Sequence, residues 1–182
     1  STGVYLSLVR HVEGEGAEVQ FLGTSESWKI LSNDSSQDLI ARFCIHASLN
    51  GDKFESGTAF NTCDNSQPSS WSKKWPIICD YFGLKGVAPP ETGNGPQPGE
   101  FVQDHLEQWK ELEKKAGLVG GRVSNDRSYG GFPFFIMSMF NFDRQQDTTK
   151  THKVWGDKTE EWDTKQAWYT AFDRFRQAKI IP

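Results

Sequence analysis

The amino-acid sequence predicts an α/β chain that is mostly helical and has only a few short strands. Five segments place apolar side chains at helical spacing, whereas two short runs, residues 19–22 and 58–61, are typical of strands. Helical patterns therefore outnumber strand patterns. The length of 182 residues suits one ordinary domain or one lobe of a larger enzyme, and 13% aromatic residues beside 36% hydrophobic ones predict an aromatic-rich core.

The opening segment is expected to be a helix that ends near Gly14 or Gly16. Apolar residues from position 4 to position 8 predict its buried face. Only Ser1 or Thr2 precedes that face as a capping residue. We therefore expect the chain to begin inside a secondary-structure element. The strand expected over residues 19–22 follows this helix.

The second helix is expected to start at residues 33–35 and to end near residues 50–51. Asp38 follows Ser35 by three residues, which is typical of a capped helix start. Apolar positions at helical spacing predict its inward face, which consists of Leu39, Ile40, Phe43, Cys44 and Ala47. Residues 58–61 then predict a short buried strand.

The third helical pattern contains a proline, which leaves its start open. Its apolar positions are Trp71, Trp75, Ile78, Cys79 and Phe82. Pro76 lacks an amide hydrogen, so either the helix begins only near Trp75 or it kinks at the proline. Gly83 is the expected carboxyl-terminal cap.

A segment rich in proline and glycine divides the chain. Residues 86–100 hold four prolines and four glycines, which predicts a surface loop or linker between residues 1–85 and residues 101–182. The fourth helix follows this segment and is expected to end at Gly117, with an inward face of Val102, His105, Leu106, Trp109, Leu112 and Ala116. The fifth is expected to start at Asp163, with Gln166 in a capping-box relation, and to bury Trp168, Ala171, Phe172 and Phe175.

Composition and charge argue against several classes of partner. The net charge of −4 and the pI near 5.6 give no basic patch for nucleic acid or for an anionic membrane. The sequence contains no apolar run of the roughly 20 residues that span a bilayer. Three cysteines, Cys44, Cys63 and Cys79, lack the spacing of a zinc site. We therefore expect a cytoplasmic protein with reduced thiols, and neither a nucleic-acid nor a membrane partner.

Motifs that would carry catalysis or bind a cofactor are weak. Tyr81 and Lys85 match the Tyr-x-x-x-Lys pattern of a proton donor and its lysine, but Gly83 between them predicts a helix end rather than a shared helix face. The glycine pairs at 14/16 and 93/95 lack the third glycine of a dinucleotide fingerprint. The sequence therefore predicts no catalytic, cofactor-binding or metal-binding residue in this chain.

The most apolar segment of the chain is the one candidate for ligand binding. Residues 132–140 combine phenylalanine and methionine side chains, which form adaptable walls for a flat apolar ligand. Plain core packing is the alternative explanation of the same residues. The cluster consists of Phe132, Phe134, Phe135, Met137 and Met139.

Several blocks, taken in chain order, resemble one family. They are residues 34–41 (DSSQDLIA), 59–61 (AFN), 71–75, 80–84 (DYFGL) and the ending 178–182 (AKIIP). The chain resembles the carboxyl-terminal, substrate-binding half of an extended short-chain dehydrogenase/reductase of the progesterone 5β-reductase and iridoid synthase-like group, including its fungal relatives. The resemblance covers nearly the whole chain.

The resemblance implies a Rossmann-type enzyme whose other half holds NADP(H) and the catalytic Tyr and Lys. It implies that Tyr5 and the cluster of residues 132–140 face the pocket for an apolar enone or related molecule, that residues 1–85 contribute strands to the Rossmann sheet, and that residues 101–182 form a helical substrate-binding part. In this interpretation NADP(H) binds only together with the other half. A companion Rossmann chain or a homodimer would complete the sheet.

Two further interpretations stay open at this point. The chain would otherwise be a free-standing, cofactor-independent cyclase or isomerase that folds a polyketide-like or terpenoid-like intermediate in an aromatic cavity. A catalytically inactive remnant that acts as an interaction partner is the third alternative. The first two are distinguished by whether turnover of an apolar substrate requires a nucleotide.

Overall fold

A computed structural model describes residues 2–55, 57–123 and 134–182. The helices in these ranges are α1 (Thr2–Glu13), α2 (Gln37–Leu49), α3 (Trp71–Asp80), α4 (Pro98–Asp104), α5 (Leu106–Ala116), α7 (Thr149–Trp155) and α8 (Thr164–Gln177). Single short turns are η1 (Ser27–Lys29), η2 (Gly51–Lys53), the π-helical turn η4 (Phe135–Met139) and η5 (Gly156–Lys158). The strands are β1 (Glu18–Gln20), β2 (Leu31–Ser32), β3 (Ser69–Ser70) and β4 (Lys85–Val87). The mostly helical α/β class is confirmed.

The strands form two small sheets that α3 connects. β1 pairs in parallel with β4, with Val19 opposite Gly86, and β2 pairs antiparallel with β3. α3 runs directly from β3 to the segment before β4, and the Trp75 indole on α3 donates to the Val19 carbonyl at 2.9 Å. β1 was expected to lack a partner within this chain, but β4 provides one. The physical reason is that Gly86 and Val87, expected in a loop, adopt extended backbone together with Lys85 beside β1.

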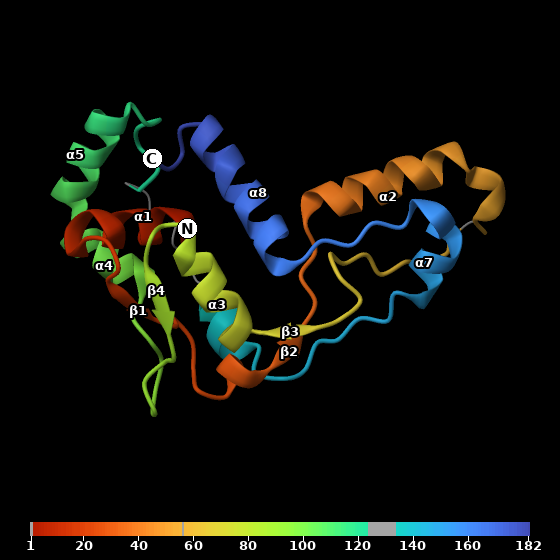
Figure 1. Cartoon of the computed structure of the whole chain (residues 1–182), viewed down its shortest axis with the longest axis horizontal. Helices are drawn as coiled ribbons and strands as arrows, with labels where there is room; N and C mark the ends of the chain where they lie inside the picture. The colour runs from red at the N-terminus through yellow and green to blue at the C-terminus, as the bar shows by residue number, and fades with distance from the viewer. Residues whose placement is uncertain (1, 56, 124–133) are drawn as a thin grey trace.

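The molecule is elongated (Figure 1), and its buried apolar side chains form two separate cores. The larger core lies among α1, α3, α4, α5 and β1, and it includes the fully buried side chains of Leu6, Phe21, Trp75 and Trp109. The smaller one lies where α2 and α7 meet and consists of Leu39, Phe43, Trp155, Trp162 and Ala167. α8 contributes Phe172 to the larger core and Ala167 to the smaller one, so it spans the middle of the molecule (Figure 1).

Several expected helix boundaries are confirmed. α1 ends at Glu13, and Gly117 ends α5 with a φ of 61°. Asp163 caps α8 by accepting a hydrogen bond from the Gln166 amide at 2.7 Å. The third helix begins at Trp71 and includes Pro76, so of the two alternatives left open, a start only near Trp75 is excluded.

The expected strand at residues 58–61 does not form. Side chains from the α7 region bind this backbone, because Thr151 Oγ1 donates to the Asn61 carbonyl and Lys150 Nζ donates to the Ala59 carbonyl at 3.5 Å. Asn61 in turn donates from Nδ2 to the Asp147 carbonyl at 3.0 Å. These bonds take the place of a strand ladder, so the segment lies as irregular backbone beside α7.

Some helix faces also differ from expectation. α2 buries Leu39 and Phe43 but leaves Ile40 and Cys44, which were expected on its inward face, exposed. Phe175 on α8 is exposed as well. The fourth expected helix is two helices, since His105 between α4 and α5 has non-helical backbone angles of −116° and 29°.

Residues 86–100 are not a single loop. Gly86 and Val87 belong to β4, and α4 begins at Pro98, where the missing amide hydrogen has no cost in the first helical turn. Between them the chain passes so close to β1 that a Cβ on Gly95 would lie 1.8 Å from the Phe21 carbonyl oxygen. Only glycine allows this approach of two backbones.

We predict that Gly95→Ala lowers the free energy of unfolding by more than about 2 kcal/mol, because the added methyl must displace backbone. Gly51→Ala is the matched control, since a Cβ there meets nothing within 4 Å. Urea denaturation of both variants measures the effect. Equal stability of the two variants would contradict the close approach.

Candidate functional site

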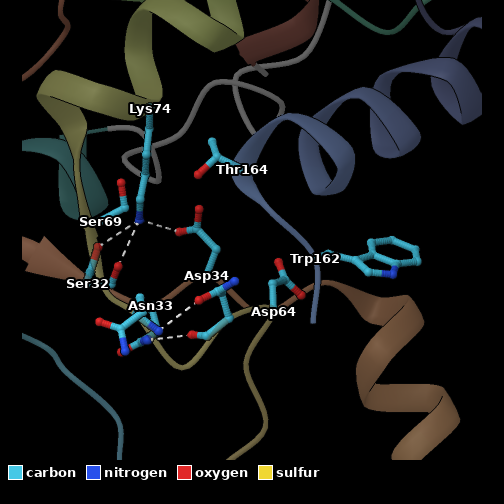
Figure 2. A pocket seen from close by; sticks show the side chains of 10 residues that line it. Ser32, Asn33, Asp34, Asp64, Ser69, Lys74, Trp162 and Thr164 are labelled. Atoms are coloured by element: carbon cyan, nitrogen blue, oxygen red, sulfur yellow. Dashed lines mark hydrogen bonds and ion pairs between the residues drawn. The ribbon is translucent and has the colours of Figure 1, made fainter. Parts of the chain in front are cut away.

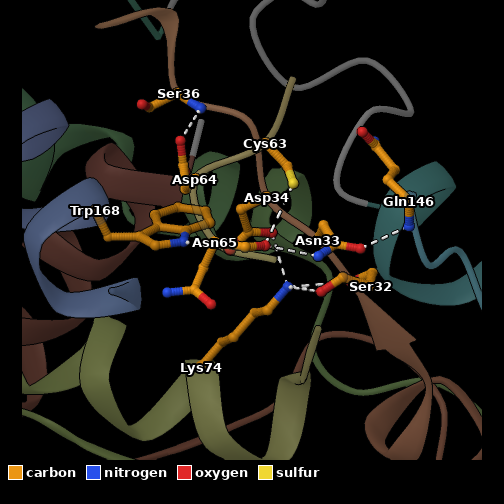
Figure 3. A network of polar contacts seen from close by, with 10 residues as sticks. All are labelled: Ser32, Asn33, Asp34, Ser36, Cys63, Asp64, Asn65, Lys74, Gln146 and Trp168. Carbon is orange, nitrogen blue, oxygen red and sulfur yellow. Dashed lines mark hydrogen bonds and ion pairs between the residues drawn. The ribbon is translucent and has the colours of Figure 1, made fainter. Parts of the chain in front are cut away.

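Three segments that lie far apart in the sequence meet beside α2. The Asp64 amide donates to the Asp34 carbonyl at 2.8 Å, and the Ser36 amide donates to Asp64 Oδ1 at 2.6 Å. The Gln146 amide donates to Asn33 Oδ1 at 2.8 Å (Figure 3). Residues 32–36, 62–65 and 144–146 are thereby held together. The sequence forms α2 at this point because Ser36 caps the helix by accepting from the Leu39 amide.

A buried lysine lies at the centre of this junction. Lys74 reaches from α3, its side chain is 1% exposed, and its ammonium group lies 2.7 Å from Asp34 Oδ1. It also donates to Ser32 Oγ and to the Ser32 carbonyl, each at 3.1 Å (Figure 2). The Trp168 indole of α8 donates to the other Asp34 oxygen at 3.2 Å (Figure 3). We call Lys74, Asp34, Ser32 and Trp168 the Lys74 network.

A second carboxylate lies next to this network. Asp64 is buried, and burial raises its pKa above the ordinary value. The hydrogen bonds from Ser36 and the Lys74 charge act in the opposite direction but are the smaller effects. Asp64, Asp34 and Lys74 also line a polar cavity of about 30 Å³, which is large enough for a water molecule (Figure 2).

A larger cavity of about 540 Å³ shares Ser32, Asn33, Asp34 and Asp64 with the polar cavity. Its apolar wall comes from α3, η4 and α8, and consists of Trp71, Ile136, Met137, Ala167, Trp168 and Ala171. Trp71 and Trp168 meet edge to face at 6.4 Å between ring centroids, so they form one continuous aromatic surface. Its polar wall consists of residues 32–36 with Asp64, Arg144 and Gln146. Large volume, apolar walls and a few polar groups are typical of a small-molecule site.

The residues expected to face a ligand lie in three different environments. Met137 is buried and lines the larger cavity. Tyr5 is 2% exposed in the core of α1, where it packs against Phe101 at 5.5 Å, and burial raises the pKa of its hydroxyl. Phe134, Phe135 and Met139 are exposed on or beside η4, and none of the three lines the cavity. Phe132 lies outside the described residues.

The Tyr-x-x-x-Lys match is a coincidence of sequence. Tyr81 lies at the end of α3 and donates from its hydroxyl to Asp173 Oδ1 at 2.7 Å, whereas Lys85 begins β4. The two therefore do not share a helix face. Within the described ranges, no group of His, Cys, Asp and Glu side chains could hold a metal ion, and no helix is long and apolar enough to cross a bilayer.

The central residues of this site were not predicted to be functional. Lys74 follows Trp71 by three residues and precedes Ile78 by four, so helical spacing puts it on the apolar face of its helix. A lysine at such a position indicates a buried partner. Arg144 carries no comparable signal, because it reaches the cavity through loop pairing: its amide donates to the Leu31 carbonyl at 2.9 Å.

Comparison with known proteins identifies the family of this chain. The model of the PRISE-like Rossmann-fold domain matches residues 1–182, and the chain belongs to this family. Among curated proteins, the short chain dehydrogenase sirS of Leptosphaeria maculans is 32% identical over the whole chain and 46% of its own length. The (S)-8-oxocitronellyl enol synthase of Nepeta cataria is 23% identical over 98% of the chain and 43% of its own length. The resemblance to this group of short-chain dehydrogenases is confirmed.

The match covers the whole of this chain but only part of each relative. The chain spans about half the length of the curated relatives that it matches, including sirS and a second short chain dehydrogenase of the same organism, sirQ, which is 28% identical over 44% of its own length. The family and its oxidoreductase origin are therefore established for this chain.

We predict that Lys74→Met lowers the free energy of unfolding by about 3 kcal/mol, because it leaves Asp34 without its buried cation. Arg10→Met is the control, since the Arg10–Glu15 pair is exposed and its loss costs at most about 1 kcal/mol. Chemical denaturation compares the two. Adding Asp34→Asn to Lys74→Met should restore part of the loss, and an unchanged loss in the double variant would contradict the pairing.

We predict that Asp64→Asn makes stability less sensitive to rising pH. The folded-state pKa of Asp64 is raised, so the stability that the protonated acid contributes is complete below its ordinary value of 3.8 and is lost as pH rises through the folded-state pKa. The asparagine keeps an acceptor for the Ser36 amide without the buried charge. Unfolding free energies of both proteins between pH 4 and pH 7 test this: the variant should gain relative to the native chain as pH rises, and a constant difference would contradict it.

Proposed function

We propose that this chain is the substrate-binding part of an NAD(P)H-dependent oxidoreductase that acts on an apolar enone or a related small molecule. The observation that carries the proposal is the cavity of about 540 Å³. The chain that contains it belongs to the PRISE-like Rossmann-fold family, and three relatives are named (S)-8-oxocitronellyl enol synthase.

The walls of the cavity suit a flat apolar molecule. Trp71 and Trp168 offer aromatic surface, and Met137 offers a side chain that adapts to the shape of its neighbour. Ala167 and Ala171 are small, which keeps space free beside α8. In this proposal these residues hold the carbon skeleton of the substrate and exclude water from it.

The Lys74 network holds the backbone of one wall of the cavity in place. Ser32 and Asp34 line the cavity, and both bond to Lys74. Because Lys74 is buried and Trp168 holds the second Asp34 oxygen, this backbone has little freedom to move. We assign the network a positioning role, in which it fixes one wall of the pocket and takes no part in proton transfer.

The described residues do not fit a nicotinamide cofactor. A phosphate cradle needs free backbone amides in a glycine-rich turn between a strand and a helix. Gly93 and Gly95 do lie between β4 and α4, but Gly95 is buried against the Phe21 carbonyl and leaves no space for a phosphate. We therefore propose that NADP(H) is held by residues other than those described, and that the hydride it supplies reaches a substrate bound in this cavity.

The proposal extends to compartment and partners. The exposed apolar side chains around η4, which are 40% to 57% exposed, support a covering partner there: Phe134, Phe135, Met139 and Phe142. We propose that this partner is a companion Rossmann chain or a second copy of this chain. We also propose that the protein is cytoplasmic and acts in secondary metabolism.

We predict that Ala171→Phe, which fills the cavity, lowers kcat/KM for enone reduction at least about tenfold. The enzyme is the longest polypeptide that the gene encodes, the substrate is benzylideneacetone, and NADPH oxidation is followed by absorbance. Ala116→Phe on the exposed end of α5 is the control and should have no effect. Conversion of the apolar substrate without any nucleotide would overturn the reductase proposal and favour a cofactor-independent isomerase.

A further inference from the structure

One cation in the cavity has no partner of opposite charge. Arg144 lines the cavity of about 540 Å³, and within residues 2–55, 57–123 and 134–182 its guanidinium group forms no hydrogen bond and no ion pair. Its Nε atom is fully covered and lacks an acceptor. Burial lowers the pKa of Arg144, and only the Asp34 charge acts against this effect. Burial of an unpaired guanidinium group lowers the stability of the fold, so its presence in the cavity needs a functional or structural explanation.

The position of Arg144 is defined by the fold. Its amide donates to the Leu31 carbonyl at 2.9 Å, and its backbone forms a parallel bridge with Ser32. The guanidinium carbon lies 5.0 Å from the centre of the Phe140 ring, which holds the planar group by a cation–π contact. Backbone and side chain are therefore both held before any ligand binds.

The other charges of the cavity are already engaged. The two Asp34 oxygens accept from Lys74 and Trp168, and Asp64 accepts from the Ser36 amide. Lys74 is satisfied by Asp34 and Ser32. Within the described part of the chain, Arg144 is the lining residue with charged donors left over.

We propose that Arg144 determines substrate specificity by binding a carbonyl or carboxylate oxygen of an otherwise apolar ligand. The inference rests on the proposed use of this cavity as the substrate pocket and adds the chemical class of the ligand. A planar guanidinium offers parallel N–H groups to an oxygen of this kind, and a hydrogen bond from a charged donor is stronger than one between neutral groups. The apolar wall would hold the carbon skeleton while Arg144 fixes which end carries the oxygen.

Three probes with one phenylpropenyl skeleton test the inference. Cinnamate carries a carboxylate, benzylideneacetone carries a neutral ketone, and β-methylstyrene carries no oxygen. Calorimetry or tryptophan fluorescence measures their dissociation constants with the longest polypeptide that the gene encodes. We expect at least one oxygen-bearing probe to bind about tenfold or more tightly than β-methylstyrene. Tighter binding of cinnamate indicates a carboxylate ligand, whereas tighter binding of benzylideneacetone indicates a neutral carbonyl ligand.

Variants assign the preference to Arg144. Arg144→Met should weaken the preferred oxygen-bearing probe about tenfold or more while changing β-methylstyrene binding less than about twofold. Arg144→Lys keeps the charge and should restore part of the affinity. Arg122→Met, at an exposed arginine, is the control and should change none of the three dissociation constants.

The outcomes separate this inference from the proposed function. Equal binding of all three probes to the native protein overturns the role of Arg144 while the cavity remains an apolar pocket. An equal loss for all three probes in Arg144→Met does so as well, since it indicates a structural role. Failure of every probe to bind overturns the substrate pocket itself. Equal binding by the native protein overturns the inference without any variant, and the loss and partial recovery in Arg144→Lys assign the preference if Arg144→Met fails to fold.

Discussion

The buried ion pair between Lys74 and Asp34 is the interaction on which the middle of this molecule depends. It joins α3 to the segment that leads into α2, and Trp168 extends it to α8. A charge this deeply buried is tolerated only when its partners are close and complete, and here one carboxylate and two Ser32 oxygens satisfy the ammonium group. The larger core and the smaller core thus meet at a polar junction.

The same junction determines where the cavity lies. The apolar side chains of α3, η4 and α8 face a loop wall that the Lys74 network holds in place. Lys74 and Asp34 bond to each other and to neighbouring groups within the network, so they offer few hydrogen-bonding groups to a ligand. Arg144 differs from them because its Nε atom is buried without an acceptor. Apolar volume together with one unpaired cation among the described lining residues supports a ligand with one polar end.

The family and the described geometry bear on different parts of the reaction. The PRISE-like family establishes an oxidoreductase ancestry, whereas the chain spans about half of its curated relatives and its described residues offer no cradle for a dinucleotide. In the proposed function, this part binds the substrate and hydride transfer depends on other residues. The exposed aromatic side chains at η4 fit the same proposal, because they are costly to leave in contact with water.

The sequence by itself predicted α1, α2, α3, α8 and the segment of α4 and α5, though not α7, and it indicated the family, because apolar periodicity, caps such as Asp163 and ordered motif blocks are local signals. It failed at residues 58–61, whose backbone is bonded by side chains from α7. Only the tertiary structure decided the site, since Asp34, Lys74, Arg144 and Trp168 come from four separate segments. Distances between such segments depend on packing of the whole chain, and no local pattern encodes them.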